Sequence, residues 1–319
     1  MPKGAANLLR NRFSPGGSRN LRLNTIQPHA DGQNLTFIRR TPFAMSRPAP
    51  ARSANGLLLL MILLVLVLVA VLFVCRQRQQ RSGPPPVAVT GLEIPAHRNG
   101  DTPVPHEGYT LGYRSDARQA AWVAYLLTAQ EMATAHEPRS NNFRPDPAVP
   151  GGTADNSDYE GSGYDRGHLA SAEDLSYSRR SMSQSFYYSN MSPQVPAFNR
   201  GVWRRLEELV RFWATAYDSI YIVSGPVLEP GLPVIGPHHV AVPRYYYKAV
   251  LRYGHNGTEG IAFLLRNEPS AATLKSFAVP IDSVESVTGL DLFPQLPDET
   301  EVRIEREVRE KEWRWTRKQ

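Results

Sequence analysis

The chain has 319 residues, 41% of them hydrophobic, which is enough apolar material for one sizeable core with appendages. Its net charge of +6 is concentrated at one end, because residues 1–55 carry nine Lys or Arg and a single acid, Asp31. The remaining residues sum to −2, so the overall charge is no evidence for a basic nucleic-acid groove. The only cysteine, Cys75, excludes an internal disulfide.

Residues 1–55 have the composition of a disordered tail. They are rich in Arg, Asn, Pro and Ser and poor in aromatic residues, so they cannot bury enough apolar surface to offset the entropy lost on ordering. An Arg-rich, acid-poor start is also typical of mitochondrial presequences. The alternatives, which we favour, are a cytoplasmic tail or an over-extended start with Met45 as the true initiator.

Residues 56–75, GLLLLMILLVLVLVAVLFVC, contain neither charge nor proline. As a helix rising about 1.5 Å per residue they would span about 30 Å, the thickness of a bilayer core. We therefore predict one transmembrane helix that anchors the chain.

Arginines flank this span on both sides, with four close before it and three after it: Arg39, Arg40, Arg47, Arg52, Arg76, Arg78 and Arg81. Since positive charge favours the cytosolic side, we expect the N-terminus inside and residues 76–319 on the non-cytosolic side. In a bacterium this is the periplasmic face of the inner membrane. The alternative is the mitochondrial inner membrane, facing the intermembrane space.

The proline run SGPPPV within residues 76–95 predicts an extended, semi-rigid tether. We expect a globular domain over residues 96–297. Residues 298–319 are predicted to form a charged, solvated surface helix, because acids and bases recur there four residues apart, as in Glu305 and Arg309.

Strand patterns divide the globular domain. They predict a hairpin of residues 109–113 and 120–128, a buried strand at 219–224 closed by a turn at Gly225-Pro226, and an antiparallel pair of segments 239–253 and 260–266. Residues 137–160, dense in Pro, Gly, Asn and Asp, are predicted to form a loop. Its arginines, Arg139 and Arg144, either reach a phosphate or simply face solvent.

The stretch from 161 to 211 carries the candidate chemistry. His168 follows Asp165, Arg166 and Gly167, and it alone of eight histidines lies in a dense polar and glycine context. An imidazole with a pKa of about 6.5 can take a proton from water at neutral pH, as a general base must. The paired histidines at 238–239 lack such a sequence context, and we expect them to be structural.

Asn199 opens a predicted helix whose inner face is Trp203, Leu206 and Val210. Glu207 and Arg211 follow at eight and twelve residues, so both share a face with Asn199. An amide oxygen with a carboxylate nearby suits Mg²⁺, which prefers oxygen ligands and retains much of its water. The alternative is a helix N-cap at Asn199 followed by ordinary surface.

Together these motifs resemble the DNA/RNA non-specific endonucleases, the ββα-metal nucleases. The resemblance rests on YDRGHLA, SNMSPQ and NRGVWRRLE, and it covers roughly residues 100–295. Within that family, GSGYDRGHLASA and FYYSNMSPQVPAFN look especially like the endonuclease G branch. It implies an α+β fold, a ββα-metal core with a central antiparallel sheet flanked by helices, here preceded by the transmembrane helix.

The resemblance also implies roles for six residues. His168 would be the general base, and Asn199 would bind Mg²⁺ directly, with Mn²⁺ as a substitute. Glu207 would orient metal-bound water, and Asn190 would hold the hydrogen-bond network of the site together. Arg166 and Arg211 would contact the substrate phosphate. The family also uses an arginine in the loop before the histidine; the local register places Asn141 there, so either Arg139 serves or the role is displaced.

The expected reaction is hydrolysis of phosphodiester bonds in DNA and RNA with little sequence preference, leaving 5′-phosphate and 3′-hydroxyl ends. The expected partners are these substrates, the membrane through residues 56–75, and a second copy of the chain as a homodimer option. Two other functions remain open at this point. One is a membrane-tethered receptor that binds nucleic acid without cutting it, and the other is a metallohydrolase for small phosphodiesters.

Overall fold

The structure is a computed structural model that describes residues 54–81, 91–96, 100–254 and 257–315. Almost all of the predicted disordered tail, and residues 82–90 of the predicted tether, lie outside these residues. The chain divides into two units, Met1–Leu68 and Val69–Gln319, each considered by itself.

Helix α1 spans Ala54–Arg81, and the apolar side chains from Leu58 to Val74 that the structure describes are exposed. Measured over the described residues, no helix combines the length and apolar character that a membrane crossing requires. The predicted transmembrane helix is therefore not confirmed.

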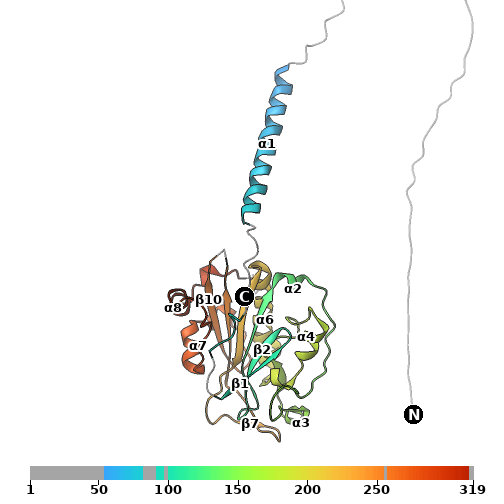
Figure 1. The fold of residues 1–319 in the computed structure, drawn as a ribbon, viewed down its shortest axis with the longest axis vertical. Coiled ribbons are helices and arrows are strands. Elements are labelled where there is room, and N and C mark those ends of the chain that lie inside the picture. The colour runs from blue at the N-terminus through green and yellow to red at the C-terminus, as the bar shows by residue number, and fades with distance from the viewer. Residues whose placement is uncertain (1–53, 82–90, 97–99, 255–256, 316–319) are drawn as a thin grey trace, which may run out of the picture. The chain divides into compact units, whose positions relative to one another are not determined.

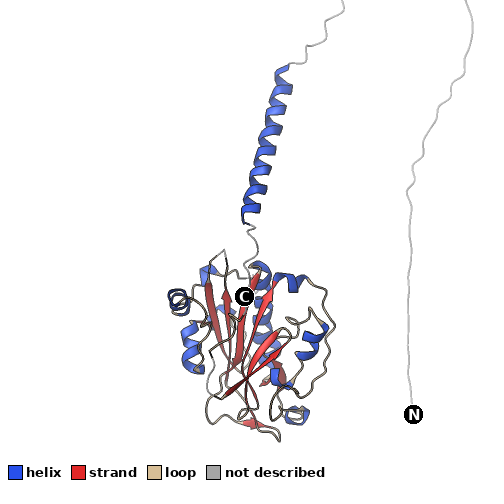
Figure 2. Ribbon diagram, viewed as in Figure 1, coloured by secondary structure: helices blue, strands red, loops and turns tan. Residues whose placement is uncertain are grey.

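The body of the protein is built on one antiparallel sheet of seven strands, flanked by helices (Figures 1 and 2). Its strands, in spatial order, are β1 (Asp101–His106), β2 (Tyr109–Arg114), β3 (Gln119–Thr128), β6 (Ser219–Pro226), β9 (Tyr245–Arg252), β10 (Glu259–Arg266) and β11 (Ala278–Val279). The α+β class and the central antiparallel sheet are confirmed. The predicted hairpin is β2–β3, and the predicted pair of segments is β9–β10.

Each central strand buries both of its faces, which separates the core into two layers. Along β6, Ile220 and Ile222 pack in one layer, whereas Tyr221 and Val223 pack in the other. This alternation follows from the two-residue period of a strand. The strand also runs through Gly225 to Pro226 and pairs with β9 there, so the turn predicted at these residues is wrong.

The two layers are closed by different helices. The long helix α6 (Arg204–Ala216) covers the first layer with a row of buried residues that includes Leu206 and Val210, and Trp203 just before it joins this row, as the sequence predicts. The second layer is covered by α7 (Ile281–Thr288) and α8 (Asp298–Glu305), which lie beside β10 in Figure 1. The sheet therefore separates α6 from α7 and α8.

The remaining elements are short. They are α2 (Ala129–Ala133), α3 (Asn156–Tyr159), α4 (Arg179–Gln184), α5 (Pro196–Phe198), the 3₁₀ turns η1 (Tyr188–Asn190), η3 (Leu274–Phe277) and η4 (Glu310–Glu312), the π-helical turn η2 (Asn199–Trp203), and the two-stranded pairs β4 (Asp165–His168) with β5 (Met191–Gln194) and β7 (Val234–Ile235) with β8 (Val240–Ala241).

The C-terminal segment differs from its prediction. Helix α8 ends at Glu305, and from there to residue 315, where the described chain ends, the one further helical element is the turn η4. The indole of Trp313 is buried against that of Trp213, with ring centroids 4.4 Å apart. A solvated helix over 298–319 is therefore wrong, because the tryptophans gain more by packing on the first core layer than by remaining on a helix in solvent.

Candidate active site

The candidate site is organised by the β4–β5 hairpin and the helical segment that follows it. His168 ends β4 and pairs with Met191 of β5, and Asn199 lies at the end of α5, where the chain enters η2 and α6. Gly167 is required by this packing, since a Cβ there would lie 2.2 Å from the buried side chain of Gln194. Two strands and a helix thus position the two predicted key residues.

The imidazole of His168 is enclosed by aromatic rings. It meets Phe186 and Phe143 edge-on, with centroids 4.9 and 5.9 Å away. Its Nε2 atom is buried and has no hydrogen-bond partner among the described residues. Burial, followed by the positive charges of Arg139 and Arg166, lowers the pKa of His168 to about 3. The ring is therefore neutral at pH 7.

Asn199 is oriented by an acid from β4. Its amide nitrogen donates to Asp165 Oδ2 at 2.9 Å, and the guanidinium of Arg200 binds both oxygens of the same carboxylate. Although burial opposes ionisation, the hydrogen bonds from Arg200 and Asn199 hold the pKa of Asp165 below its usual value. The amide oxygen of Asn199 accepts no hydrogen bond from the described residues, so it is available to a ligand.

Asn199 lines an open, polar pocket of about 570 Å³. Three arginines line it: Arg166 from β4, whose guanidinium lies 4.1 Å above the ring of Phe143, Arg139 from the loop before the histidine, and Arg200, which is paired with Asp165. Arg139 and Arg166 both act on the pKa of His168. Asn199 and three cations therefore line one hollow, and Phe143, which also lines it, contacts the neutral ring of His168.

The loop arginines separate into two kinds. Arg139 donates to the Oδ1 atom of Asn141 at 2.9 Å and faces the pocket, so the structure favours Arg139 over Asn141 as the residue beside the histidine. Arg144 instead stacks on Tyr187 and donates to the backbone and hydroxyl oxygens of Ser183. Arg144 is thus occupied in holding the loop.

Asn190 is fully buried and uses its amide to fix the backbone next to His168. Its oxygen accepts from the N–H of Ala170 at 2.9 Å, and its nitrogen donates to the carbonyls of Ala170 and Ser185, both at 2.9 Å. These bonds connect the chain just after His168 to the end of α4. Asn190 therefore positions His168 through the backbone at Ala170, and it does not line the pocket of Asn199.

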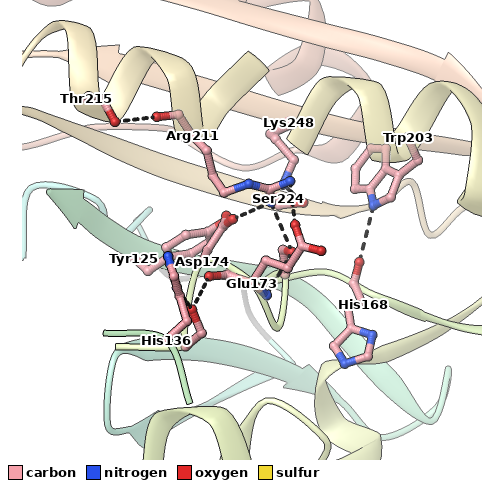
Figure 3. A network of polar contacts seen from close by, with 12 residues as sticks. Tyr125, His136, His168, Glu173, Asp174, Trp203, Arg211, Thr215, Ser224 and Lys248 are labelled. Carbon is pink, nitrogen blue, oxygen red and sulfur yellow. Dashed lines mark hydrogen bonds and ion pairs between the residues drawn. The ribbon is translucent and has the colours of Figure 1, made fainter. Parts of the chain in front are cut away.

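Arg211 forms part of a buried charge network, drawn in Figure 3. Its guanidinium lies 2.8 Å from Asp174 and 2.7 Å from Glu173, and Asp174 also accepts a hydrogen bond from Tyr125. This network borders a second hollow of about 600 Å³, which Arg139 also lines. The structure thus engages Arg211 with two carboxylates and does not bring it into the pocket of Asn199.

Glu207 lies on α6 between the two groups. Burial raises the pKa of its carboxyl group; the charge of Lys248 opposes this shift, and that of Asp174 adds to it. Lys248 is itself fully buried, donates to Ser224 at 3.1 Å and lies over the ring of Trp203 (Figure 3). The lysine is a buried countercharge for Glu207 that comes from a strand across the core.

His238 has a structural partner, as expected for a histidine outside the site. Its Nδ1 atom lies 2.9 Å from Asp158 Oδ2, and its backbone N–H donates to Oδ1 of the same carboxylate. This pairing fastens the loop after β7 to α3. The neighbouring Asp155 caps α3, so the oxygens of this group are already used.

Residues 94–299 match the family model of the DNA/RNA non-specific endonucleases. The chain belongs to this family. As a DNA/RNA non-specific endonuclease it is a nucleic-acid phosphodiesterase, which confirms the resemblance seen in the sequence.

Several named nucleases are similar to this endonuclease. Human endonuclease G, a mitochondrial protein, is 35% identical over 204 residues, which cover 60% of this chain and 69% of the relative. A nuclease from Nostoc sp. is 34% identical over 212 residues, covering 63% and 76% of the two chains. A solved structure of a complex of endonuclease G with the inhibitor EndoGI superposes with a TM-score of 0.59 at 31% identity, covering 63% of this chain and 89% of that one.

The residues around Asn199 fit a hard divalent metal of the kind used by this metal-dependent family. Asn199 offers the pocket a neutral amide oxygen, on the side of the amide opposite the nitrogen that donates to Asp165. One fixed oxygen with open space beside it suits an ion that keeps several waters, as Mg²⁺ does. No residue supplies a thiolate there, which disfavours soft metals.

Sequence reasoning missed three contributions to the site. From the sequence, Asp165 is placed only to order the local turn before His168, Phe143 and Phe186 carry no signal, and Lys248 lies in a strand far along the chain. Only Asp165 was within reach of sequence reasoning, since it lies in the same motif as His168. The others depend on packing.

Proposed function

We propose that this endonuclease hydrolyses phosphodiester bonds of DNA and RNA with Mg²⁺ as its cofactor, Mn²⁺ substituting, and leaves 5′-phosphate and 3′-hydroxyl ends. The observation that carries the proposal is a neutral, buried His168 whose Nε2 atom has no described partner, near a pocket that Asn199 and three arginines line. Contacts of this kind recognise phosphate rather than base, so little sequence preference follows.

In the proposed reaction His168 takes a proton from the attacking water as its oxygen bonds to phosphorus. The bond between phosphorus and the 3′ oxygen breaks, and this oxygen takes a proton from water to become the 3′-hydroxyl. The low pKa of His168 keeps it in the basic form, and the edge-on rings of Phe143 and Phe186 fix its orientation. Arg166 and Arg139 hold the phosphate and offset the charge that develops on its oxygens.

Asn199 would hold the metal through its amide oxygen, with Asp165 fixing the direction of that oxygen. The ion, when bound, supplies positive charge next to the phosphate. Glu207 acts from the other side of the helical segment, and Lys248 keeps a positive charge close to its carboxyl group. Arg211 acts through Glu173 and Asp174, which hold it beside Glu207.

We further propose that residues 56–75 anchor the enzyme in a membrane with the nuclease on the non-cytosolic side. The support is the uninterrupted apolar sequence and the exposed apolar side chains along α1. The bacterial inner membrane, facing the periplasm, is the first choice. The mitochondrial inner membrane is the alternative, since endonuclease G and related nucleases are named as mitochondrial.

Digestion of supercoiled plasmid with Mg²⁺ and with EDTA, beside a DNA-binding assay, tests the reaction. We expect nicking and then degradation in Mg²⁺, none in EDTA, and products that a ligase accepts without prior treatment. Binding without cleavage in Mg²⁺ would instead support a receptor. Cleavage of small phosphodiesters but not of plasmid would support a metallohydrolase of a different substrate class.

A further inference from the structure

A second group of acids lies far from the pocket of Asn199, between α7 and α8. Asp282 and Glu285 come from α7, and Glu305 is the last residue of α8. One carboxylate oxygen from each lies within 4.8 Å of the other two. The two helices pack on the second core layer, and the sheet separates them from α6. The acids therefore take no part in the reaction proposed above.

Glu305 is the unusual member of this group. Its residue is only 7% exposed, and its Oε1 atom is buried without a hydrogen-bond partner among the described residues. A buried ionised oxygen without a partner is costly, because it has lost its water and gained nothing in return. Its carboxylate lies close to those of two other acids. Among the described residues, no group of the protein binds all three carboxylates.

Among the described residues, the charged neighbours that act on Glu285 and Glu305 are acids. Asp291 and Glu301 face the group and reinforce the effect of burial, which raises the pKa of Glu285 to about 7 and that of Glu305 to about 8. Asp298 also acts on Glu301. The arginine on α8, Arg303, is turned away and binds Glu259 and the carbonyl of Thr258 on the other side.

A shared proton is a poor solution for this geometry. One oxygen of Glu285 already accepts the N–H of Leu292 at 2.7 Å, and Glu305 Oε1 is not hydrogen-bonded to either neighbouring acid in the described structure. A divalent cation would satisfy the orphaned oxygen and cancel the repulsion among the three carboxylates at the same time.

We propose that Asp282, Glu285 and Glu305 form a binding site for Ca²⁺ that fastens α8 to α7. The donors are all carboxylate oxygens, which a hard cation requires, and each can bind through one or two oxygens. Asp282 is exposed and leaves room for water in the remaining positions. Ca²⁺ accepts this irregular, oxygen-rich arrangement, whereas Mg²⁺ demands a stricter octahedron.

The test measures thermal unfolding and calorimetric binding of the full chain in EDTA and across a series of Ca²⁺ concentrations. The background is Asn199→Ala, so that the proposed catalytic ion cannot contribute. We expect one bound Ca²⁺ and a Tm that rises with the logarithm of its concentration. The variants Glu305→Gln and Asp282→Asn should lose both effects, and Glu299→Gln, at an exposed acid of α8, should keep them.

The metal-free state gives a second readout. Without Ca²⁺, adding Glu305→Gln to the Asn199→Ala background should leave the Tm unchanged or raise it, since it removes repulsion. With Ca²⁺, the Asn199→Ala protein should have the higher Tm. Asp282 is exposed, so Asp282→Asn remains informative if Glu305→Gln fails to fold. No Ca²⁺-dependent rise in Tm, or a rise that Asp282→Asn retains in full, would overturn the proposal.

Discussion

At the scale of single residues, Asn199 and Glu207 differ in how they would serve the metal. Asn199 lines the open pocket, whereas Glu207 is half-buried on α6 and feels the charge of Lys248. We therefore expect Asn199→Ala to shift the Mg²⁺ concentration needed for half-maximal rate upward, and Glu207→Ala mainly to lower the rate at saturating Mg²⁺. Titration of Mg²⁺ against cleavage rate checks both; a wild-type midpoint in Asn199→Ala would contradict direct ligation.

The buried imidazole of His168 makes stability depend on pH. Its folded pKa of about 3 lies below the ordinary value of 6.5, so below pH 6.5 the unfolded chain binds a proton that the folded chain does not. The contribution is fully present above pH 6.5 and is lost as the pH falls toward 3.

Between pH 6.5 and 5 the wild type should therefore lose about 2 kcal/mol more unfolding free energy than His168→Gln, whose side chain does not titrate. Denaturant unfolding of both proteins at several pH values measures the difference. Parallel pH curves would show that the imidazole titrates normally in the folded protein and is not held neutral by burial.

Much of the site could be predicted at this scale, because His168, Arg166, Asn190 and Asn199 lie within short motifs on one hairpin and its following turn. What the sequence could not show was where each side chain finds its partner. Arg211 shares a helix with Asn199, yet it pairs with Glu173 and Asp174. Helical periodicity predicts the face on which a residue lies. The partner of Arg211 depends on the segment that packs against that face, here the one with Glu173 and Asp174.

At the scale of elements, the hairpin of β2 and β3 and the amphipathic α6 follow their sequence patterns. The hairpin's β3 is an apolar run buried on both faces, and α6 buries one apolar stripe. The π-helical turn η2 at Asn199–Trp203 does not follow from the sequence pattern, because a single extra residue in a helical turn leaves no trace in a 3.6-residue pattern. It excludes the predicted N-cap at Asn199, whose amide donates to Asp165 instead.

The C-terminal segment gives an element-scale prediction. Trp313 is buried against Trp213, whereas Trp315 is only half-buried at the edge of the same cluster. Trp313→Ala should destabilise the fold by about 3–5 kcal/mol, the usual cost of deleting a buried aromatic ring. Trp315→Ala is the matched control and should cost clearly less. Equal, negligible effects in denaturant unfolding would mean that this segment is solvated, as its charge pattern alone suggests.

At the scale of the whole molecule, the two ends of the sequence carry different kinds of information. Several motifs in a fixed order identify the nuclease domain, whereas residues 56–75 are marked only by their apolar composition. The predicted orientation of residues 56–75 in the membrane depends on a difference of one arginine near the span. The fold of the nuclease domain does not determine this orientation.

A nuclease of low sequence preference held in the cytosol would threaten the cell's own genome, so we predict that residues 76–319 lie on the other side. Protease added to spheroplasts, or to mitoplasts, should digest the nuclease domain without detergent. A cytosolic marker protein should survive in the same sample. Protection of the domain until detergent is added would reverse the orientation.

The proposed phosphodiester hydrolysis depends on His168 as its general base. The most direct test is the initial rate of plasmid cleavage by His168→Ala at saturating Mg²⁺, with DNA affinity and Tm measured on the same sample. We expect the rate to fall roughly 10²–10⁴-fold, as the loss of a general base does, while affinity remains near that of the wild type. A folded variant that cleaves within a few-fold of the wild type would contradict the account.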